Sequence, residues 1–170
     1  MESHSPGHIF IGGTSAGGNL VLTATQQIVA QGIAPPSAIY AGTPWADLTK
    51  TGDTLFTNEG VDRILVTYDG QLESAASLYA GNTSFTDPVI SPLYGTFDSF
   101  PPTFLLTGTR DMFLSDTVRV NRAIRESGGL TLLEVFEGMS HADYLVAYDT
   151  PESEAAYFAI KQFFTGYAKQ

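Results

Sequence analysis

Four short runs of β-branched and aromatic residues limit most strongly what this chain can fold into. They lie at residues 9–12, 37–41, 103–107 and 131–136 and read as apolar on both faces. Buried parallel strands with helices on either side have this pattern, whereas a sheet with one wet face alternates apolar and polar residues. The runs therefore predict a mostly parallel sheet of about four strands.

Helical segments separate these runs. Residues 16–31 carry apolar side chains at helical spacing and stop at Gly32, while residues 115–127 link the third and fourth runs. Residues 151–168 start with Pro-Glu-Ser-Glu and form a closing amphipathic helix. The strand–helix–strand order predicts an α/β three-layer sandwich whose site lies at the carboxyl ends of the strands.

A single domain over residues 1–170 accounts for the chain length. Between residues 46 and 100 the periodicity fades into Gly, Thr, Asp and Pro, apart from one helix predicted at 69–79. We expect this stretch to be an insertion that lies over the sheet edge and the site. Trp45 just precedes it, and core packing is favoured there over a place in a pocket wall.

Charge and composition exclude several classes of partner. Eight basic and 18 acidic side chains give a net charge of -10, which opposes binding to nucleic acid and to anionic lipid. The chain has no cysteine, so it has no disulfide and no thiolate metal site. No apolar run approaches the ~20 residues of a membrane span, and residues 1–13 do not resemble a signal peptide. A cytoplasmic protein is expected.

Residues 13–17 read Gly-Thr-Ser-Ala-Gly and match the Gly-x-Ser-x-Gly motif between a predicted strand and a predicted helix. In that position the motif holds a nucleophilic serine at the tip of a strained turn, and glycines such as Gly13 and Gly17 let strand and helix approach. Ser15 is therefore the candidate nucleophile. A phosphate-binding loop is disfavoured because Gly18 is followed by Asn19 and not by Lys.

A serine nucleophile needs an imidazole to remove its proton. The chain has three histidines, and His4 and His8 precede the first predicted strand, whereas the expected order is serine, acid, histidine. His141 follows the strand at 131–136 and is the candidate base, the alternative being a surface-loop histidine. His4 and His8 have the spacing of a helical metal pair but lack a third ligand, so we expect neither metal nor cofactor.

The imidazole in turn needs a carboxylate. Asp111 lies just past the strand at 103–107 and is the candidate acid. Asp116 lies in the first turn of the next helix, where a partner of the helix dipole is the favoured interpretation. On the same helix we expect one solvated face to carry three arginines, at positions 119, 122 and 125.

Four collinear segments resemble the hormone-sensitive-lipase-like family of α/β-hydrolase esterases: GGTSAGGNL (12–20), DPVISPLYG (87–95), TGTRDMFLSD (107–116) and FEGMSHAD (136–143). The resemblance implies a partial α/β-hydrolase fold and a carboxylic ester hydrolase, acting through an acyl-enzyme on small-molecule esters with short to medium acyl chains. Ser15, Asp111 and His141 match the triad positions. Thr14 stands where many members carry Asp.

The larger departure from the family concerns the oxyanion hole. The fold takes one backbone N–H from the residue after the serine, here Ala16, and another from an upstream His-Gly-Gly loop. Fourteen residues precede Ser15 and contain no His-Gly-Gly. Loss of one donor costs about 10²–10³ in turnover, so weakened activity is expected. A catalytically deficient assembly or interaction module, or a truncated part of a longer enzyme, are the alternatives.

The strand at 9–12 is interior in the family but lacks an upstream neighbour here. Its unpaired backbone groups lie beside apolar side chains, and such an edge favours pairing with another chain. We therefore expect a homo-oligomer in which a second copy covers this edge.

Overall fold

The computed structural model describes residues 9–168, and its centre is a parallel sheet of four strands. The strands follow one another in chain order across the sheet: β1 (Phe10–Thr14), β2 (Ala38–Gly42), β3 (Thr103–Gly108) and β4 (Thr131–Phe136). In the register, Ile11 lies opposite Ile39, and Leu105 opposite Leu133. This confirms the predicted α/β class and the four-strand parallel sheet.

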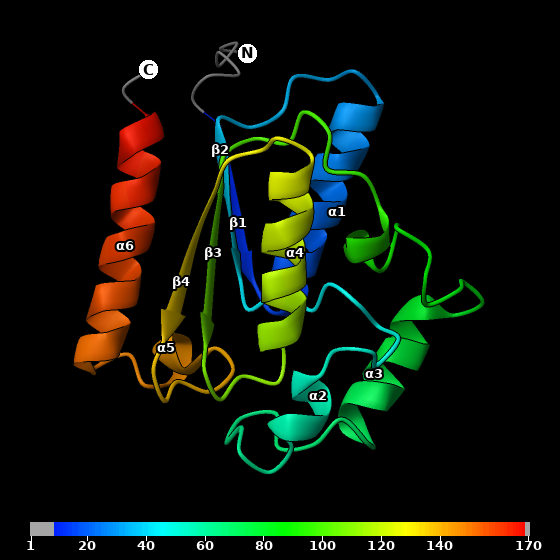
Figure 1. Ribbon diagram of the computed structural model, residues 1–170, viewed down its shortest axis with the longest axis vertical. Coiled ribbons are helices and arrows are strands. Elements are labelled where there is room, and N and C mark those ends of the chain that lie inside the picture. The colour runs from blue at the N-terminus through cyan, green and yellow to red at the C-terminus, as the bar shows by residue number, and fades with distance from the viewer. Residues whose placement is uncertain (1–8, 169–170) are drawn as a thin grey trace.

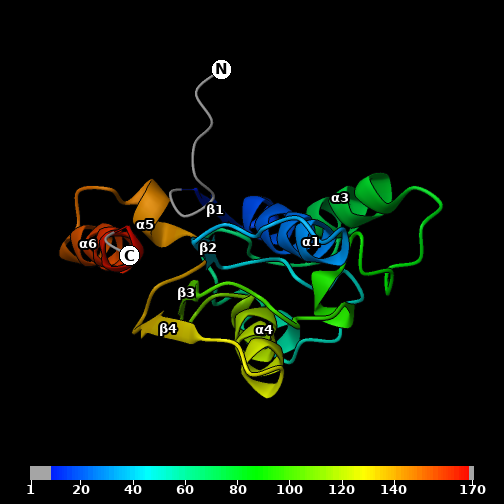
Figure 2. The same cartoon turned by 90° about the horizontal axis from the view of Figure 1, so that it is seen from above.

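Helices cover both faces of the sheet. Helices α1 (Ala16–Ala30) and α4 (Leu114–Glu126) lie on one face, and α6 (Pro151–Tyr167) lies on the other with the short α5 (Asp143–Val146), as Figures 1 and 2 show. Apolar side chains of α1 and α4 pack on β2 and β3 from one side, and those of α6 pack on the same strands from the other. These three layers form the expected sandwich.

Burial differs between the central and the outer strands. Every residue of β2 and β3 is buried, but Leu132 and Val135 of β4 are exposed. The prediction that all four runs are buried on both faces is therefore wrong for the two outer strands, since no residue of β1 is fully buried either. For Leu132 the reason is that α6 packs over β2 and β3, so the third layer leaves its face of the last strand open to solvent.

A long connection joins β2 to β3 and contains α2 (Thr54–Thr57), α3 (Gln71–Ala80) and the 3₁₀ turn η2 (Pro92–Tyr94). Helices α2 and α3 lie beyond the carboxyl ends of the strands (Figure 1). The connection has an apolar cluster of its own, in which Trp45 packs with Tyr68 and Phe113. It therefore lies close to the strand ends that carry the predicted site residues.

Candidate active site

Ser15 occupies a strained turn between β1 and α1. Its backbone has φ 61° and ψ −122°, a region that side-chain-bearing residues rarely enter and that costs about 1–3 kcal/mol. Its N–H donates to the carbonyl of Gly42 at 2.9 Å. A Cβ on Gly13 would lie 2.4 Å from the carbonyl oxygen of Gly17, but a Cβ on Gly17 would meet no described atom within 4 Å. Of the two predicted elbow glycines, Gly13 is the one that the described atoms crowd.

The structure brings the three predicted side chains together at the carboxyl ends of β1, β3 and β4. The imidazole Nε2 of His141 lies 2.8 Å from the Oγ of Ser15. Its Nδ1 lies 3.0 Å from Oδ1 of Asp111. Both distances are within the reach that proton transfer and orientation require. An imidazole held in this way can take the serine proton while the carboxylate supports the other ring nitrogen.

Buried contacts hold Asp111 and His141 in place. Oδ2 of Asp111 accepts a hydrogen bond from the Thr107 hydroxyl at 2.8 Å, and Oδ1 accepts one from the backbone N–H of Phe113 at 2.8 Å. The Phe113 ring packs edge-on against the imidazole, with 4.9 Å between ring centroids. Asp111 is fully buried and His141 nearly so, which protects the pair from water. Ser15 remains partly accessible.

An apolar cavity of about 300 Å³ opens beside the serine. As the first residue of α1, Ala16 has a backbone N–H without an acceptor inside the helix, and its side chain forms part of the cavity wall. Trp45 stacks on Phe113 at 5.2 Å and also lines the cavity, so it has both the packing role and the pocket role considered from the sequence. The cavity is lined by Ala16, Asn19, Leu20, Trp45, Leu48, Ala75, Ala76 and Tyr79.

Thr14 connects the turn to a pair of tyrosines. Its hydroxyl lies 2.7 Å from the hydroxyl of Tyr144, which is also hydrogen-bonded to the hydroxyl of Tyr40. Burial raises the pKa of both phenols, so the group stays uncharged at neutral pH. Here Thr14 takes part in a neutral network in the layer between the sheet and α5, rather than placing a charge next to Ser15.

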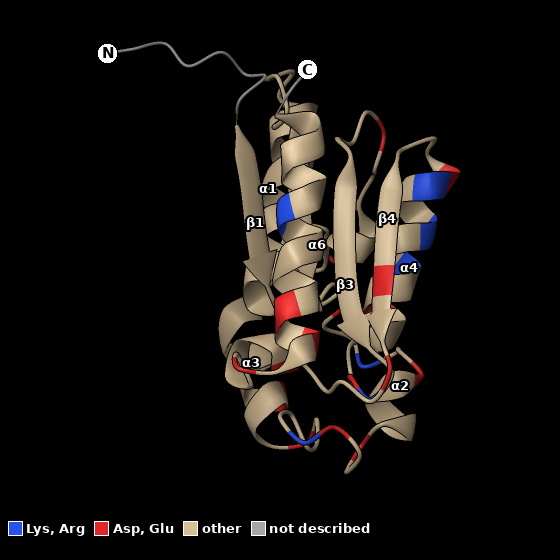
Figure 3. Cartoon of the chain, turned by 90° about the vertical axis from the view of Figure 1, so that its left-hand side faces the viewer, with Lys and Arg blue, Asp and Glu red and all other residues tan. Residues whose placement is uncertain are grey.

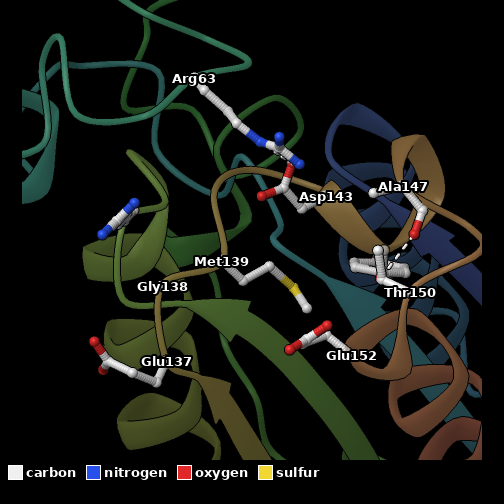
Figure 4. Close-up of a pocket in the computed structure, with 10 residues that line it drawn as sticks. Arg63, Glu137, Gly138, Met139, Asp143, Ala147, Thr150 and Glu152 are labelled. Carbon is white, nitrogen blue, oxygen red and sulfur yellow. Dashed lines mark hydrogen bonds and ion pairs between the residues drawn. The ribbon is translucent and has the colours of Figure 1, made fainter.

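A second cavity, of about 270 Å³, is lined by Glu137, Met139 and Asp143 from the segment that carries His141 (Figure 4). Charged side chains surround it, among them Arg63, which forms an ion pair of 2.8 Å with Asp143. Glu152 of α6 also lines it. None of the three predicted catalytic side chains lines either cavity, but Ala16, which directly follows Ser15, lines the apolar one, so the apolar cavity is the one associated with Ser15.

Two predictions about helix α4 are wrong. Asp116 is buried, and its Oδ2 accepts hydrogen bonds from the backbone N–H groups of Ala46 and Asp47, each at 2.9 Å. Burial and the neighbouring Asp47 charge raise the pKa of Asp116 to about 8, so it carries no charge for the helix dipole at neutral pH. The prediction of a solvated arginine face is wrong for Arg119, which forms an ion pair of 2.8 Å with Asp47, whereas Arg122 and Arg125 are exposed.

The sequence did not point to Asp62, a buried carboxylate that contacts the backbone of the two loops that carry Asp111 and His141. It lies in the stretch without periodicity, between exposed neighbours, and its partners are about 50 and 79 residues away in sequence. No local pattern signals such a residue. Its spatial neighbours identify it.

Residues 9–168 contain neither a candidate metal site nor a candidate membrane span. In this part of the chain no group of three or more His, Asp or Glu side chains could hold a metal ion. No helix among these residues is both long and apolar enough to cross a bilayer. His4 and His8, considered above as a metal pair, lie outside the described residues.

Comparison with known families and sequences gives consistent matches. A family model described as alpha/beta hydrolase fold matches residues 1–145. A triacylglycerol lipase of Mycobacterium tuberculosis is 32% identical over 118 residues, covering 69% of this chain and 22% of the lipase. An esterase of Acinetobacter venetianus is 28% identical over 172 residues, covering 97% of this chain and 54% of the esterase.

Solved structures of esterases share the fold. One esterase superposes with a TM-score of 0.92 at 46% identity, covering 95% of this chain and 49% of its own. An esterase from the bacterial hormone-sensitive lipase family superposes with a TM-score of 0.91 at 29% identity, covering 98% of this chain and 55% of its own. The chain thus spans about half the length of these esterases.

Proposed function

The chain belongs to the α/β-hydrolase fold family, and we propose that it hydrolyses carboxylic esters with Ser15 as nucleophile, His141 as general base and Asp111 as the orienting acid. The observation that carries the proposal is the pair of hydrogen bonds that links Ser15 to His141 and His141 to Asp111. Relatives named esterase, acetyl-hydrolase and triacylglycerol lipase support the reaction class.

In the first step, Oγ of Ser15 bonds to the ester carbonyl carbon while Nε2 of His141 takes the hydroxyl proton. The oxyanion accepts a hydrogen bond from the N–H of Ala16. When the bond from the carbonyl carbon to the alkoxy oxygen breaks, His141 returns the proton to the departing alcohol. Water then adds to the acyl-enzyme by the same route, and the carboxylic acid leaves as Ser15 regains its proton.

One oxyanion donor is assigned, at Ala16. Active sites of this kind use two, and removing one costs about 10²–10³ in kcat. For the 170-residue chain assayed alone we therefore expect turnover that is measurable but about two to three orders of magnitude below that of a site with both donors.

The apolar cavity beside Ser15 is the proposed site for the acyl chain. A cavity of 150 Å³ suffices for benzene, so about 300 Å³ has room for a short to medium acyl chain. Ala75 lines this cavity at an exposed position of α3, so Ala75→Trp fills it without disturbing the core. We expect this variant to lose hydrolysis of p-nitrophenyl hexanoate while it keeps hydrolysis of the acetate. Leu78→Trp is the control, since Leu78 is exposed on the same helix and does not line the cavity.

The test of the function is hydrolysis of p-nitrophenyl butyrate by the purified chain. We expect turnover that Ser15→Ala abolishes and that Ser127→Ala leaves unchanged, because Ser127 is an exposed serine at the end of α4. Equal rates for the wild type and Ser15→Ala would refute the assignment. A folded chain without any turnover would favour the alternative of a catalytically deficient assembly or interaction module.

A further inference from the structure

Asp62 is one of the buried carboxylates that the proposed mechanism does not use. Asp62 is 1% exposed, whereas Val61 and Arg63 on either side are exposed. Such a group is costly to bury unless hydrogen bonds satisfy it. Within residues 9–168, every hydrogen bond that the side-chain carboxylate of Asp62 accepts comes from a backbone N–H group. What matters for the site is which segments of the chain those N–H groups belong to.

Two of the donors belong to the loops that carry the proposed acid and base. Oδ2 of Asp62 accepts a hydrogen bond from the N–H of Met112 at 2.9 Å, and Met112 directly follows Asp111. The N–H of His141 lies 3.3 Å from the same oxygen and 3.4 Å from Oδ1. A single carboxylate therefore contacts the backbone of both partner loops, which come from β3 and β4.

Asn58 adds a second connection to the acid loop. Its side-chain amide donates to the carbonyl of Asp111 at 2.9 Å and to that of Thr109 at 3.2 Å. Asn58 thus contacts the backbone before and at the proposed acid, and Asp62 contacts the residue after it. Together they restrain the loop on both sides of the carboxylate.

Arg63 adds a second connection to the histidine loop. Its backbone N–H donates to the hydroxyl of Ser140 at 3.1 Å. Its guanidinium Nε donates to Oδ1 of Asp143 at 2.9 Å, and Figure 4 shows the two side chains pointing toward one another. The loop is therefore restrained at the residue before His141 and two residues after it.

We propose that residues 58–63 form a positioning brace for the Asp111–His141 pair, with Asp62 as its central positioning residue. The proposal rests on the proposed function, because it explains how that acid and base keep their geometry. The two loops are also joined directly, by a hydrogen bond from the N–H of Arg110 to the carbonyl of Met139 at 3.1 Å, but a displacement of 1 Å can cost about 10²-fold in rate. The brace would prevent that displacement.

A purely local role for Asp62 is the competing interpretation, since its Oδ1 also accepts the N–H of Ile64, two residues ahead. Asp87 forms the same type of turn, with its Oδ1 2.9 Å from the N–H of Val89, and contacts neither partner loop. Asp87→Asn is therefore the matched control for Asp62→Asn. Both substitutions replace one acceptor oxygen by an NH₂ group, but only Asp62→Asn makes that change beside the backbone N–H groups of Met112 and His141.

The first measurement is steady-state ester hydrolysis. We expect Asp62→Asn to lower kcat by roughly 10- to 100-fold with little change in KM, because the apolar cavity is untouched. Asn58→Ala should lower kcat in the same way by a smaller factor. Asn58 is only partly buried, so this variant keeps the test open if Asp62→Asn fails to fold. Asp87→Asn should match the wild type.

The second measurement does not depend on turnover. In ¹⁵N-histidine-labelled protein, the Nδ1 proton of His141 should give a low-field resonance, assigned by its absence in His141→Gln. We expect this resonance to shift or broaden in Asp62→Asn and Asn58→Ala and to stay unchanged in Asp87→Asn.

The two measurements separate failure of the brace from failure of the function. A shifted or broadened resonance in the two brace variants, with Asp87→Asn unchanged, supports the brace even if the wild type does not hydrolyse esters. Ser15-dependent turnover with kcat and resonance unchanged in folded Asp62→Asn or Asn58→Ala would overturn it.

Discussion

At Gly13 the structure leaves no room for a side chain. An added Cβ would lie 2.4 Å from the carbonyl oxygen of Gly17 and 2.5 Å from its carbonyl carbon, and backbone atoms cannot move aside as a flexible side chain does. At Gly17 the same addition meets no described atom within 4 Å. The two glycines of the motif therefore differ in whether the surrounding structure has room for a side chain.

This difference predicts opposite outcomes for two matched substitutions. Gly13→Ala should lower the free energy of unfolding by about 1–3 kcal/mol, the usual cost of overpacking. Gly17→Ala should leave it unchanged or raise it by up to about 1 kcal/mol, because alanine favours helix and residue 17 lies in α1. Urea unfolding followed by the fluorescence of the single tryptophan, Trp45, measures both. Equal unfolding midpoints would contradict the steric argument.

At the scale of elements, α4 is joined to the end of β2 through a buried carboxyl. Asp116 accepts the N–H groups of Ala46 and Asp47, and Arg119 of the same helix pairs with Asp47. Two carboxyls thus share one guanidinium. Burial and the charge of Asp47 together raise the pKa of Asp116 to about 8, which keeps it protonated in the folded state at neutral pH.

The raised pKa of Asp116 makes stability depend on pH. Between pH 3.8, the ordinary pKa of an aspartate carboxyl, and about 8, the folded state holds a proton that the unfolded state has lost. The contribution of Asp116 is therefore fully present below that window and is lost as pH rises through it, by up to about 1.4 kcal/mol per pH unit. The pKa of Asp47 is lowered, so the stability that Asp47 contributes is lost as pH falls, and this effect lies below pH 3.8.

Urea unfolding at pH 5 to 8 tests this linkage. The free energy of unfolding of the wild type should fall with pH more steeply than that of Asp116→Asn, whose side chain does not titrate. Parallel pH dependences for the two proteins would show that Asp116 does not hold the proton.

The long elements could be predicted from sequence, because each has a strong local pattern. The helix expected at 69–79 lies at Gln71–Ala80, and the strand expected at 131–136 has those bounds. Helices α2 and α5 have four residues each, too few for a periodicity to appear. The exposure of Leu132 was not predictable, since it depends on where α6 packs across the sheet.

For the whole molecule, the free edge of β1 is the feature that bears on assembly. Within residues 9–168 no strand pairs with its outer side, and Figure 3 shows it at one end of the sheet. Its five residues carry no charge, although natural edge strands are commonly protected by charged side chains. The homo-oligomer expected from the sequence, with a second copy on this edge, stays a prediction.

Sedimentation velocity over a range of concentrations tests that prediction. We expect self-association that Ile9→Lys weakens, because Ile9 is exposed directly before β1. Leu130→Lys is the matched control, since Leu130 is exposed directly before β4 at the other end of the sheet. A concentration-independent monomer would exclude the oligomer.

Some residues of the candidate site could be identified from the sequence, and others could not. Ser15, Asp111 and His141 could be selected because each follows a predicted strand, and parallel strands bring their carboxyl ends together. Asp62 and Asn58 could not, because they lie in a segment without periodicity and make contacts that are 50 or more residues away. Local patterns therefore predict the proposed reacting groups, whereas tertiary contacts identify the residues proposed to hold them.

The assignment of Ser15 as an activated nucleophile is tested by reaction of the folded chain with a fluorophosphonate, read by intact mass and peptide mapping. An activated serine should take up one equivalent, located at Ser15, and the adduct should be absent from Ser15→Ala and much slower to form in His141→Gln. A folded wild type that takes up no label, or a Ser15→Ala variant labelled to the same extent, would contradict the account.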